Sequence, residues 1–204
     1  LWGLAQVAAS RGQLPRAEAL LLNALQANER HPDPFASRTE YLVALAQIAL
    51  DTGRVAEASD RSREAGRYLR DHRQDTYAYA WLEASCLTQL GAIALAEGDP
   101  TEAETHVRGA LELARTWHLV PAILRSFLAF GRLSHGRAEE EHAALLFAHA
   151  AENPASLAEV ARAARQELAA LPADLVAAAT ERAGAATVTE IARGLAAGDL
   201  PRVG

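Results

Sequence analysis

The residues best placed for metal chemistry are three histidines that recur every seven positions, at His135, His142 and His149. Glu139 stands three residues before His142, which is the Glu-x-x-His spacing of metal ligands on one face of a helix. Metal sites in helical bundles take several such ligands from different helices. Because Gly136 interrupts the helical pattern and no second Glu-x-x-His occurs, we predict no metal site.

A second group of chemically capable residues is Asp71, His72 and Asp75, in a polar connection between two apolar segments. No nucleophile motif accompanies them, so a hydrolase arrangement of Ser, His and Asp is not indicated. The chain has no Lys, which removes Schiff-base, P-loop and lysine-base chemistry. We therefore predict a protein that is not an enzyme and holds no cofactor. An enzyme whose site one sequence does not reveal stays open as an alternative.

Charge and composition exclude further classes of function. The 204 residues carry a net charge of -6 with acidic and basic residues interleaved, so no basic stripe is available for nucleic acid. No apolar run approaches the roughly 20 residues of a membrane span. The single Cys86 allows no internal disulfide and is expected to be buried, which fits a reducing compartment. We predict a cytoplasmic protein and, since Met is absent, a part of a longer chain.

Helices are the elements that must position any site. Half of the residues are hydrophobic, only 5% are aromatic, and Ala, the best helix former, is the commonest residue. No segment alternates apolar and polar residues between turn signals for long enough to predict a strand. The fold class predicted is all-α.

One phrase recurs along the chain: a small-residue helix, a Gly, a few polar residues and a second helix that opens on Ala. It occurs at 9–25, 49–65, 94–110 and, more loosely, 132–150. Such recurrence is typical of stacked helical hairpins, whose apolar faces are buried only by their neighbours. The predicted turns are at Gly12, Gly53, Gly98 and Gly136, which are 41, 45 and 38 residues apart.

The hairpins carry local signals of their own. The two prolines in 28–37 predict a loop there, and the weakly apolar segment 55–70 predicts the most exposed helix of the set. Thr101, followed three residues later by Glu104, has the spacing of a capping box and is the predicted first cap of its helix.

The pattern changes after Pro154. Three shorter helices are expected, with capping-box spacing at Ser156 with Glu159 and at Thr187 with Glu190. A terminal unit that differs from the repeats is what a stack of hairpins needs to cover its last face. We therefore predict about four hairpins in 1–152 and a C-terminal cap of about three short helices in 153–204.

These repeated positions resemble tetratricopeptide (TPR) units, with small residues where paired helices touch, a Gly in the turn and Ala residues in the second helix. The matching sets are Leu4, Ala5, Gly12, Ala17 and Ala24; Leu45, Ala46, Gly53, Ala58 and Ala65; and Leu90, Gly91, Gly98, Ala103 and Ala110. The fourth copy, with Gly136, Ala143, Phe147 and Ala150, fits with a lengthened turn. The resemblance implies a right-handed TPR-like superhelix of antiparallel helix hairpins.

The spacing exceeds the roughly 34 residues of a consensus TPR. Longer repeats of this kind, and the closing stretch after Pro154, resemble the C-terminal TPR-like sensor regions of bacterial multidomain transcriptional regulators. In those proteins an ATPase module of the STAND type and a DNA-binding domain, often of the LuxR or SARP type, precede the helical region. The resemblance implies a regulatory sensor; a free-standing TPR scaffold that mediates protein–protein interaction is the alternative.

Partners of TPR-like arrays bind along the concave face formed by the first helix of each hairpin. Alignment with the TPR positions places seven residues there: Trp2, Gln6, Val43, Gln47, Thr88, Ser126 and Phe130. The resemblance implies that this groove binds a protein, a peptide or a small effector, and that the chain contacts other domains of its parent. Ordinary solvated or packing roles for these residues stay open.

Two further expectations concern partners. The Lys and Asn clamp with which some TPR domains grip a C-terminal carboxylate is excluded, since the sequence has no Lys. Apolar residues around Leu1, Trp2 and Leu4 indicate that the chain can self-associate as a homodimer; that such a dimer results only from truncation of a longer chain stays open as the alternative.

Overall fold

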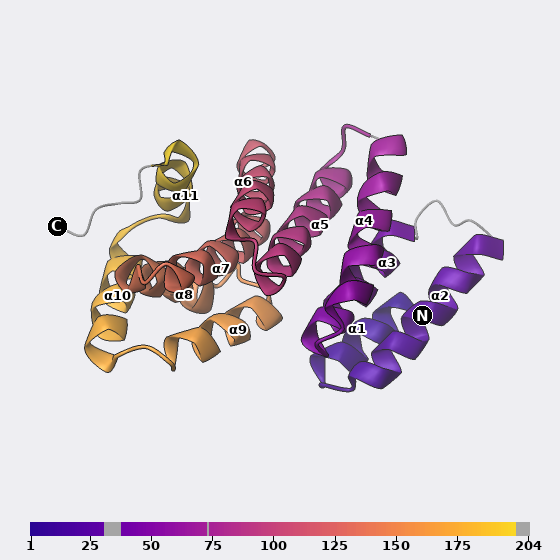
Figure 1. The fold of residues 1–204 in the computed structure, drawn as a ribbon, viewed down its shortest axis with the longest axis horizontal. Helices are drawn as coiled ribbons and strands as arrows, with labels where there is room; N and C mark the ends of the chain where they lie inside the picture. Colours follow the sequence, from indigo (N-terminus) through magenta and orange to yellow (C-terminus); the bar gives the residue numbers. More distant parts are fainter. Residues whose placement is uncertain (31–37, 73, 199–204) are drawn as a thin grey trace.

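A computed structural model describes residues 1–30, 38–72 and 74–198, and within these ranges the chain forms eleven α-helices and no strand (Figure 1). The all-α prediction is therefore confirmed. No helix in the described part of the chain is long and apolar enough to cross a membrane. The helices are α1 (Trp2–Ser10), α2 (Leu14–Arg30), α3 (Arg38–Asp51), α4 (Val55–Asp71), α5 (Tyr77–Ala96), α6 (Pro100–Thr116), α7 (Val120–Gly136), α8 (Glu140–Glu152), α9 (Ala158–Leu168), α10 (Ala173–Ala185) and α11 (Val188–Ala197).

The first eight helices pack as consecutive pairs: α1 with α2, α3 with α4, α5 with α6, and α7 with α8. The odd-numbered helices also contact one another, α3 with α5, α5 with α7 and α7 with α9, so the pairs form a stack. Figure 1 shows this stack running from the N-terminal pair to α8, with α9, α10 and α11 gathered around its far end.

The turn within each of the first three pairs depends on a left-handed glycine. Gly12, Gly53 and Gly98 have φ values of +72, +74 and +84°. The residue after each glycine donates its N–H to a carbonyl in the last turn of the preceding helix, as Arg54 does to Ala49 at 2.8 Å. This is the helix-ending geometry that glycine adopts without a Cβ clash. The three predicted turn glycines are confirmed.

The fourth turn lies two residues later than predicted. Gly136 belongs to α7, and the left-handed residue is Ala138, with φ +61°. The N–H of Glu139 donates to the Ser134 carbonyl at 2.9 Å and so closes the same kind of turn. With Ala138 as its reference the fourth pair needs no lengthened turn, because Ala143 and Ala150 then follow at the spacing that the other three pairs have.

Small residues allow the paired helices to approach closely. Five and twelve residues after each left-handed position stands an alanine that is at most 4% exposed: Ala17, Ala24, Ala58, Ala65, Ala103, Ala110, Ala143 and Ala150. Seven residues before each left-handed position stands another small residue: Ala5, Ala46, Gly91 or Gly131. A Cβ added to Gly91 would lie 2.5 Å from a methyl group of Val107, so this position has room for no larger residue.

Several helix boundaries differ from expectation. Asp99, not Thr101, caps α6, because its carboxylate accepts from the N–H groups of Thr101 and Glu102 while Pro100 has no N–H to offer. Leu157 is the residue before α9, so Ser156 does not form the predicted capping box. The capping box of Thr187 and Glu190 at α11 is confirmed.

Two further expectations were wrong in part. Of the predicted loop 28–37, residues 28–30 belong to α2 instead, and residues 31–37 lie outside the described residues. Helix α4 is not the most exposed, since it buries five residues whereas α2 buries three. The reason is that Ser59 and Ser62 of α4 face the interior, where small hydroxyl side chains fit between closely packed helices.

Helix α8 is the most deeply enclosed helix of the stack's far end. All nine residues from Ala143 to Ala151 are buried, because α7, α9 and α10 pack around them. Helix α11 returns to contact α6 and α7. The last pair of the stack is thus covered by short helices that differ from the pairs.

Candidate partner-binding face

The seven predicted site residues fall into three groups. Gln6 and Gln47 are exposed, Trp2 and Val43 are half-buried, and Thr88, Ser126 and Phe130 are buried. The first four belong to α1 and α3, where the predicted turn positions were correct. Their role in binding stays a prediction.

The three buried residues serve the interior instead. Thr88 donates its hydroxyl to the Ala84 carbonyl at 2.8 Å, and Ser126 donates its hydroxyl to the Ala122 carbonyl at 3.0 Å. Phe130 packs in the core, with the Arg108 guanidinium 5.7 Å from its ring centroid. None of the three lies on an accessible surface.

The two-residue shift of the fourth turn accounts for the choice of Ser126 and Phe130, whereas Thr88 is buried although its turn at Gly98 was predicted correctly. Counting back from Ala138, the residues equivalent to Val43 and Gln47 are Leu128 and Arg132, rather than Ser126 and Phe130. Leu128 is buried, while Arg132 keeps 40% of its side chain exposed. We use the name odd-helix row for a set of side chains that α1, α3, α5, α7 and α9 carry and through which several of these helices contact one another. Its members are Trp2, Gln6, Val43, Gln47, Trp81, Ser85, Gln89, Arg125, Arg132, Glu159 and Glu167.

Between α1 and α3 the row begins with an aromatic contact. The ring centroids of Trp2 and Tyr41 lie 5.9 Å apart, with the planes inclined by 57°. Gln6 is four residues after Trp2 and is exposed one helical turn further along. An aromatic ring beside an exposed amide is a surface that offers both apolar area and hydrogen bonds.

Between α3 and α5 the row is joined by Gln89. Its side-chain amide donates to the Val43 carbonyl at 2.7 Å and lies 3.5 Å from the Gln47 Oε1 atom. The Ser62 hydroxyl donates to the Gln89 Oε1 atom at 3.4 Å, so this buried amide has partners for both of its ends. Gln47 in turn donates to Asp51 at 2.9 Å. Gln89 was not among the predicted site residues, although an amide within a largely apolar helix is a signal of a buried polar contact.

Between α5, α7 and α9 the row is joined by Arg125. Its guanidinium donates to the Ser85 hydroxyl at 3.1 Å and to Glu159 at 3.1 Å, and it lies 5.7 Å from the centroid of a Trp81 ring. Burial lowers the pKa of Arg125, but a guanidinium stays charged at neutral pH. The half-buried Arg125 guanidinium is therefore stabilised by the exposed Glu159 carboxylate, the Ser85 hydroxyl and the face of the Trp81 ring.

A second ion pair lies along the same two helices. The Arg132 Nε atom donates to Glu167 at 2.7 Å. Two carboxylates of α9 thus neutralise the two arginines that α7 contributes to the row. Helix α9 contacts α7, and α7 contacts α5.

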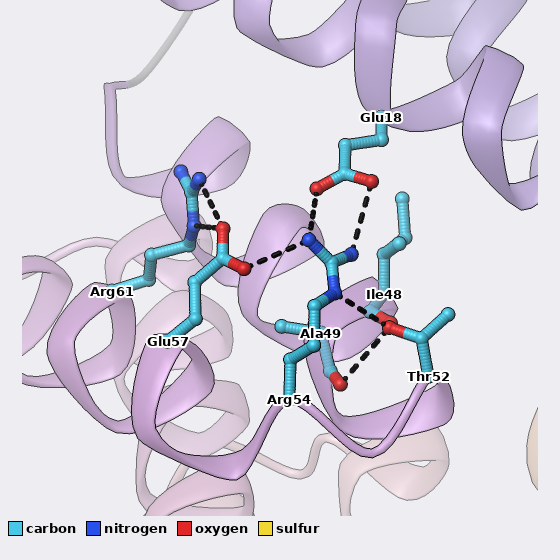
Figure 2. A network of polar contacts seen from close by, with 7 residues as sticks. All are labelled: Glu18, Ile48, Ala49, Thr52, Arg54, Glu57 and Arg61. Atoms are coloured by element: carbon cyan, nitrogen blue, oxygen red, sulfur yellow. Dashed lines mark hydrogen bonds and ion pairs between the residues drawn. The ribbon is translucent and has the colours of Figure 1, made fainter.

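The even-numbered helices carry a different kind of polar contact, shown in Figure 2. Glu18 of α2 accepts from both terminal nitrogens of Arg54, at 2.8 and 2.9 Å. The Nε atom of Arg54 donates to the Thr52 hydroxyl. Arg54 also donates to Glu57, and Glu57 accepts a second hydrogen bond from Arg61. Donation from Arg61, and next from Arg54, lowers the pKa of Glu57. The network fastens the first pair to the turn of the second.

A related cluster fastens the third pair to the fourth. Glu104 of α6 accepts from Arg108 and from Arg137 in the α7–α8 turn. These two donors, Arg137 first, lower the pKa of Glu104. Arg108 also donates to the Leu195 carbonyl at 2.7 Å, which ties α11 to α6. In both clusters the arginine and glutamate charges are paired with each other, and the pairs connect helices of the fold.

A shallow pocket opens between α4, α5 and α6. Its volume is about 140 Å³, and both apolar and polar side chains line it. Ligand pockets in proteins hold roughly 300–1,000 Å³, so this pocket is too small to enclose an ordinary organic ligand. The lining residues are Arg63, Leu90, Ile93, Ala94, Glu97, Glu102 and His106.

The histidines considered for metal binding do not converge with other ligands. Among the described residues no group of three or more His, Cys, Asp or Glu side chains could hold a metal ion. The Nε2 atoms of His142 and His149 are buried without a hydrogen-bond partner. His149 lies edge-on to the Phe127 ring at 5.9 Å, and burial lowers its pKa.

The remaining reactive candidates have local partners. His72 contacts the Tyr68 carbonyl through Nδ1 at 3.0 Å and stacks on the Tyr68 ring. Cys86 is buried, as predicted, and donates to the Ser62 carbonyl at 3.2 Å. Burial raises the pKa of its thiol to about 11, so the thiolate that would react as a nucleophile is scarce at neutral pH.

Comparison with protein-family models, curated proteins and solved structures finds no match to this chain. In the described part of the chain, the structure is all-helical and consists of four stacked helix pairs followed by α9, α10 and α11.

Proposed function

We propose that the chain is a TPR-like helical-repeat domain that binds a protein or peptide along the odd-helix row. The observation that supports this most is the exposure of Gln6 and Gln47 at equivalent positions of the first two pairs, each four residues after a half-buried apolar side chain, Trp2 or Val43. Exposed amides offer donors and acceptors to an extended backbone, and the neighbouring apolar groups offer contact area.

The size of the site favours a macromolecule over a small effector. The odd-helix row extends over several helices, whereas the pocket between α4, α5 and α6 has a volume of only about 140 Å³. An extended peptide or a helix contacts several neighbouring helices at once, and the odd-helix row spans five helices, with Gln6 and Gln47 at equivalent positions of the first two pairs. We therefore place a protein or peptide first among the proposed partners.

In the parent protein we propose the role of a regulatory sensor region, as in the bacterial transcriptional regulators that the repeats resemble. The partner is then either a signalling protein or another domain of the same parent. Sequencing upstream of Leu1 in the parent gene separates this role from that of a free-standing scaffold. An ATPase module together with a DNA-binding domain supports the regulator, and their absence from the parent chain contradicts it.

The binding proposal is tested with a displayed library of random peptides, selected against the intact chain. The affinity of the selected peptides is then measured for Gln6→Ala and Gln47→Ala and for a matched control, Gln26→Ala, whose exposed amide lies on α2. We expect the first two variants to bind about 5- to 10-fold more weakly and the control to bind like the wild type. Equal weakening by Gln26→Ala, or the absence of any selected binder, contradicts the proposal.

A further inference from the structure

Helix α11 docks on α6 and α7 through one apolar side and one hydrogen bond near its end. Ile191, Ala192 and Leu195 of α11 are at most 4% exposed. The Arg108 guanidinium of α6 donates to the Leu195 carbonyl at 2.7 Å. This carbonyl lies in the last turn of α11, where a helix carries the negative end of its dipole and a cation is favourable. The apolar cluster that the three α11 residues join includes Phe130 and Leu133 of α7.

Equivalent residues lie one pair earlier in the stack. Counted from the left-handed turn residues, Arg63 of α4 is equivalent to Arg108 of α6. In the same count Leu90 and Ile93 of α5 hold the places of the two α7 residues that belong to the α11 cluster. Arg63, Leu90 and Ile93 all line the pocket of about 140 Å³ between α4, α5 and α6. The pocket is therefore the counterpart of part of the α11 docking site.

The arginine of this pocket has no partner within the described part of the chain. Arg63 is exposed, and no hydrogen bond or ion pair connects its side chain to another described residue. Glu104, which accepts from Arg108, has no counterpart here, because Ser59 stands at the equivalent position of α4. Leu90 is half-buried, so part of its side chain stays accessible. The pocket thus offers a cation without an acceptor beside accessible apolar area.

The pocket has the size of a side chain rather than of a whole ligand. Pockets that enclose organic ligands hold roughly 300–1,000 Å³. A helix that binds in a groove needs room only for its anchoring side chains, which stand three or four residues apart, as Ile191 and Leu195 do in α11. Glu97 and Glu102 also line the pocket, so a backbone carbonyl suits Arg63 better than a free carboxylate, which these two charges would repel.

We propose that this pocket binds an amphipathic helix of a partner protein in the way that α6 and α7 bind α11. An aliphatic side chain of the partner helix enters the pocket, and a carbonyl in its last turn accepts from Arg63. None of the residues that line the pocket belongs to the odd-helix row. The pocket is therefore a second binding surface, independent of the proposed peptide-binding face.

The probe is a synthetic α11 peptide, residues 186–198 with an amidated C-terminus and a fluorescent label at its N-terminus. Its affinity for the intact 204-residue chain is measured by fluorescence anisotropy. We expect Arg63→Ala to weaken binding by about 5- to 10-fold. Arg67→Ala is the matched control and should bind like the wild type, because Arg67 is also exposed on α4 but does not line the pocket.

A change in the peptide tests the apolar anchor without altering the chain. A peptide with Leu195→Glu should bind the wild-type chain at least about tenfold more weakly, because a charge would have to enter the pocket. Equal binding of the two peptides overturns the proposal.

The absence of binding to the wild-type chain overturns the proposal as well. So does binding that Arg63→Ala leaves unchanged, because the peptide then occupies another surface, such as the place of α11 on α6 and α7. Gln47→Ala, on the odd-helix row, should not change the affinity for the α11 peptide. Equal weakening by Gln47→Ala and Arg63→Ala would contradict a separate second surface, whereas failure of the library-selected peptides alone concerns the odd-helix row.

Discussion

Gly131 of α7 and Phe147 of α8 are complementary in size: a Cβ added to Gly131 would lie 2.4 Å from the Phe147 ring. Phe147 is 1% exposed, so its ring has no open space into which to move. The same two positions hold Gly91 and Val107 in the third pair, where the added Cβ would lie 2.5 Å from a methyl group. The distance between paired helices is thus set by a small residue opposite a large one.

Gly131→Ala should therefore destabilise the protein. Overpacking of a filled interior costs about 1–3 kcal/mol in the free energy of unfolding, which urea denaturation measures. Gly136→Ala is the control, because Gly136 also lies in α7 but a Cβ there would meet no atom within 4 Å. Equal stability of Gly131→Ala and Gly136→Ala would show that the contact with Phe147 does not set the helix spacing.

The left-handed turn of the fourth pair offers a stabilising substitution. Ala138 has φ +61°, where a Cβ costs roughly 1–2 kcal/mol. Glycine removes that cost but adds about 0.4–1 kcal/mol of chain entropy to the unfolded state. We expect Ala138→Gly to raise the free energy of unfolding by about 0.5 kcal/mol or more. Gly98→Ala, made at the equivalent turn, should lower it by a similar amount, and changes of the same sign in the two variants would contradict the assignment.

These turns also show which parts of the fold the sequence predicts and which it does not. Gly12, Gly53 and Gly98 were predicted correctly because glycine is the residue that most readily becomes left-handed. The fourth turn was misplaced because Ala138 adopts that conformation despite its Cβ, while Gly136, the residue that signals a turn, stays in the helix. That shift of two residues moved Ser126 and Phe130 onto the predicted face.

The hydrogen bonds and ion pairs of the odd-helix row could not be predicted from the sequence for a different reason. Gln89 reaches a carbonyl 46 residues away, and Arg125 reaches a carboxylate 34 residues away. Periodicity within one helix predicts which side of it is apolar, but not which distant side chain meets a given polar group. Gln6 and Gln47 needed only the helical period and a correct turn, and both are exposed, as a binding face requires.

The burial of His149 predicts a loss of stability at mildly acidic pH. Burial lowers its pKa in the folded protein below the ordinary value of 6.5, so the unfolded chain takes up a proton more readily. The stabilising effect of a neutral His149 is complete above about pH 6.5 and declines as the pH falls toward the lowered pKa, by at most about 1.4 kcal/mol per pH unit. The free energy of unfolding, measured at pH 7.5 and 5.5, checks this.

His149→Leu should depend less on pH than the wild type over this interval. His135→Leu, made at an exposed histidine of α7, controls for the loss of one histidine. If His149→Leu and the wild type lose the same free energy between pH 7.5 and 5.5, the buried imidazole is not the group responsible.

Glu104 should hold α11 in place through Arg108. Glu104→Gln removes the carboxylate that accepts from Arg108 and Arg137, and we expect a loss of about 1 kcal/mol at neutral pH. Because its pKa is lowered from 4.5, the carboxylate stabilises the fold above about pH 4.5, and the effect disappears as the pH falls through the lowered value. The difference in unfolding free energy between wild type and variant, followed from pH 7 downward, measures this.

Glu112→Gln is the matched change, since Glu112 pairs with Arg115 within α6 alone and is 54% exposed. It should cost little at any pH. Hydrogen exchange should also quicken in α11 for Glu104→Gln only, because the Leu195 carbonyl loses a well-placed donor. Unchanged exchange in α11 would separate the Glu104 cluster from the docking of that helix.

The most direct test of the proposed binding face is a titration of the isotopically labelled chain with a library-selected peptide, followed by amide chemical shifts. We expect the largest shifts on α1, α3 and the exposed part of α7, at Gln6, Val43, Gln47 and Arg132. Shifts confined to α2, α4 and α6, or centred on the small pocket beside Arg63, would contradict it.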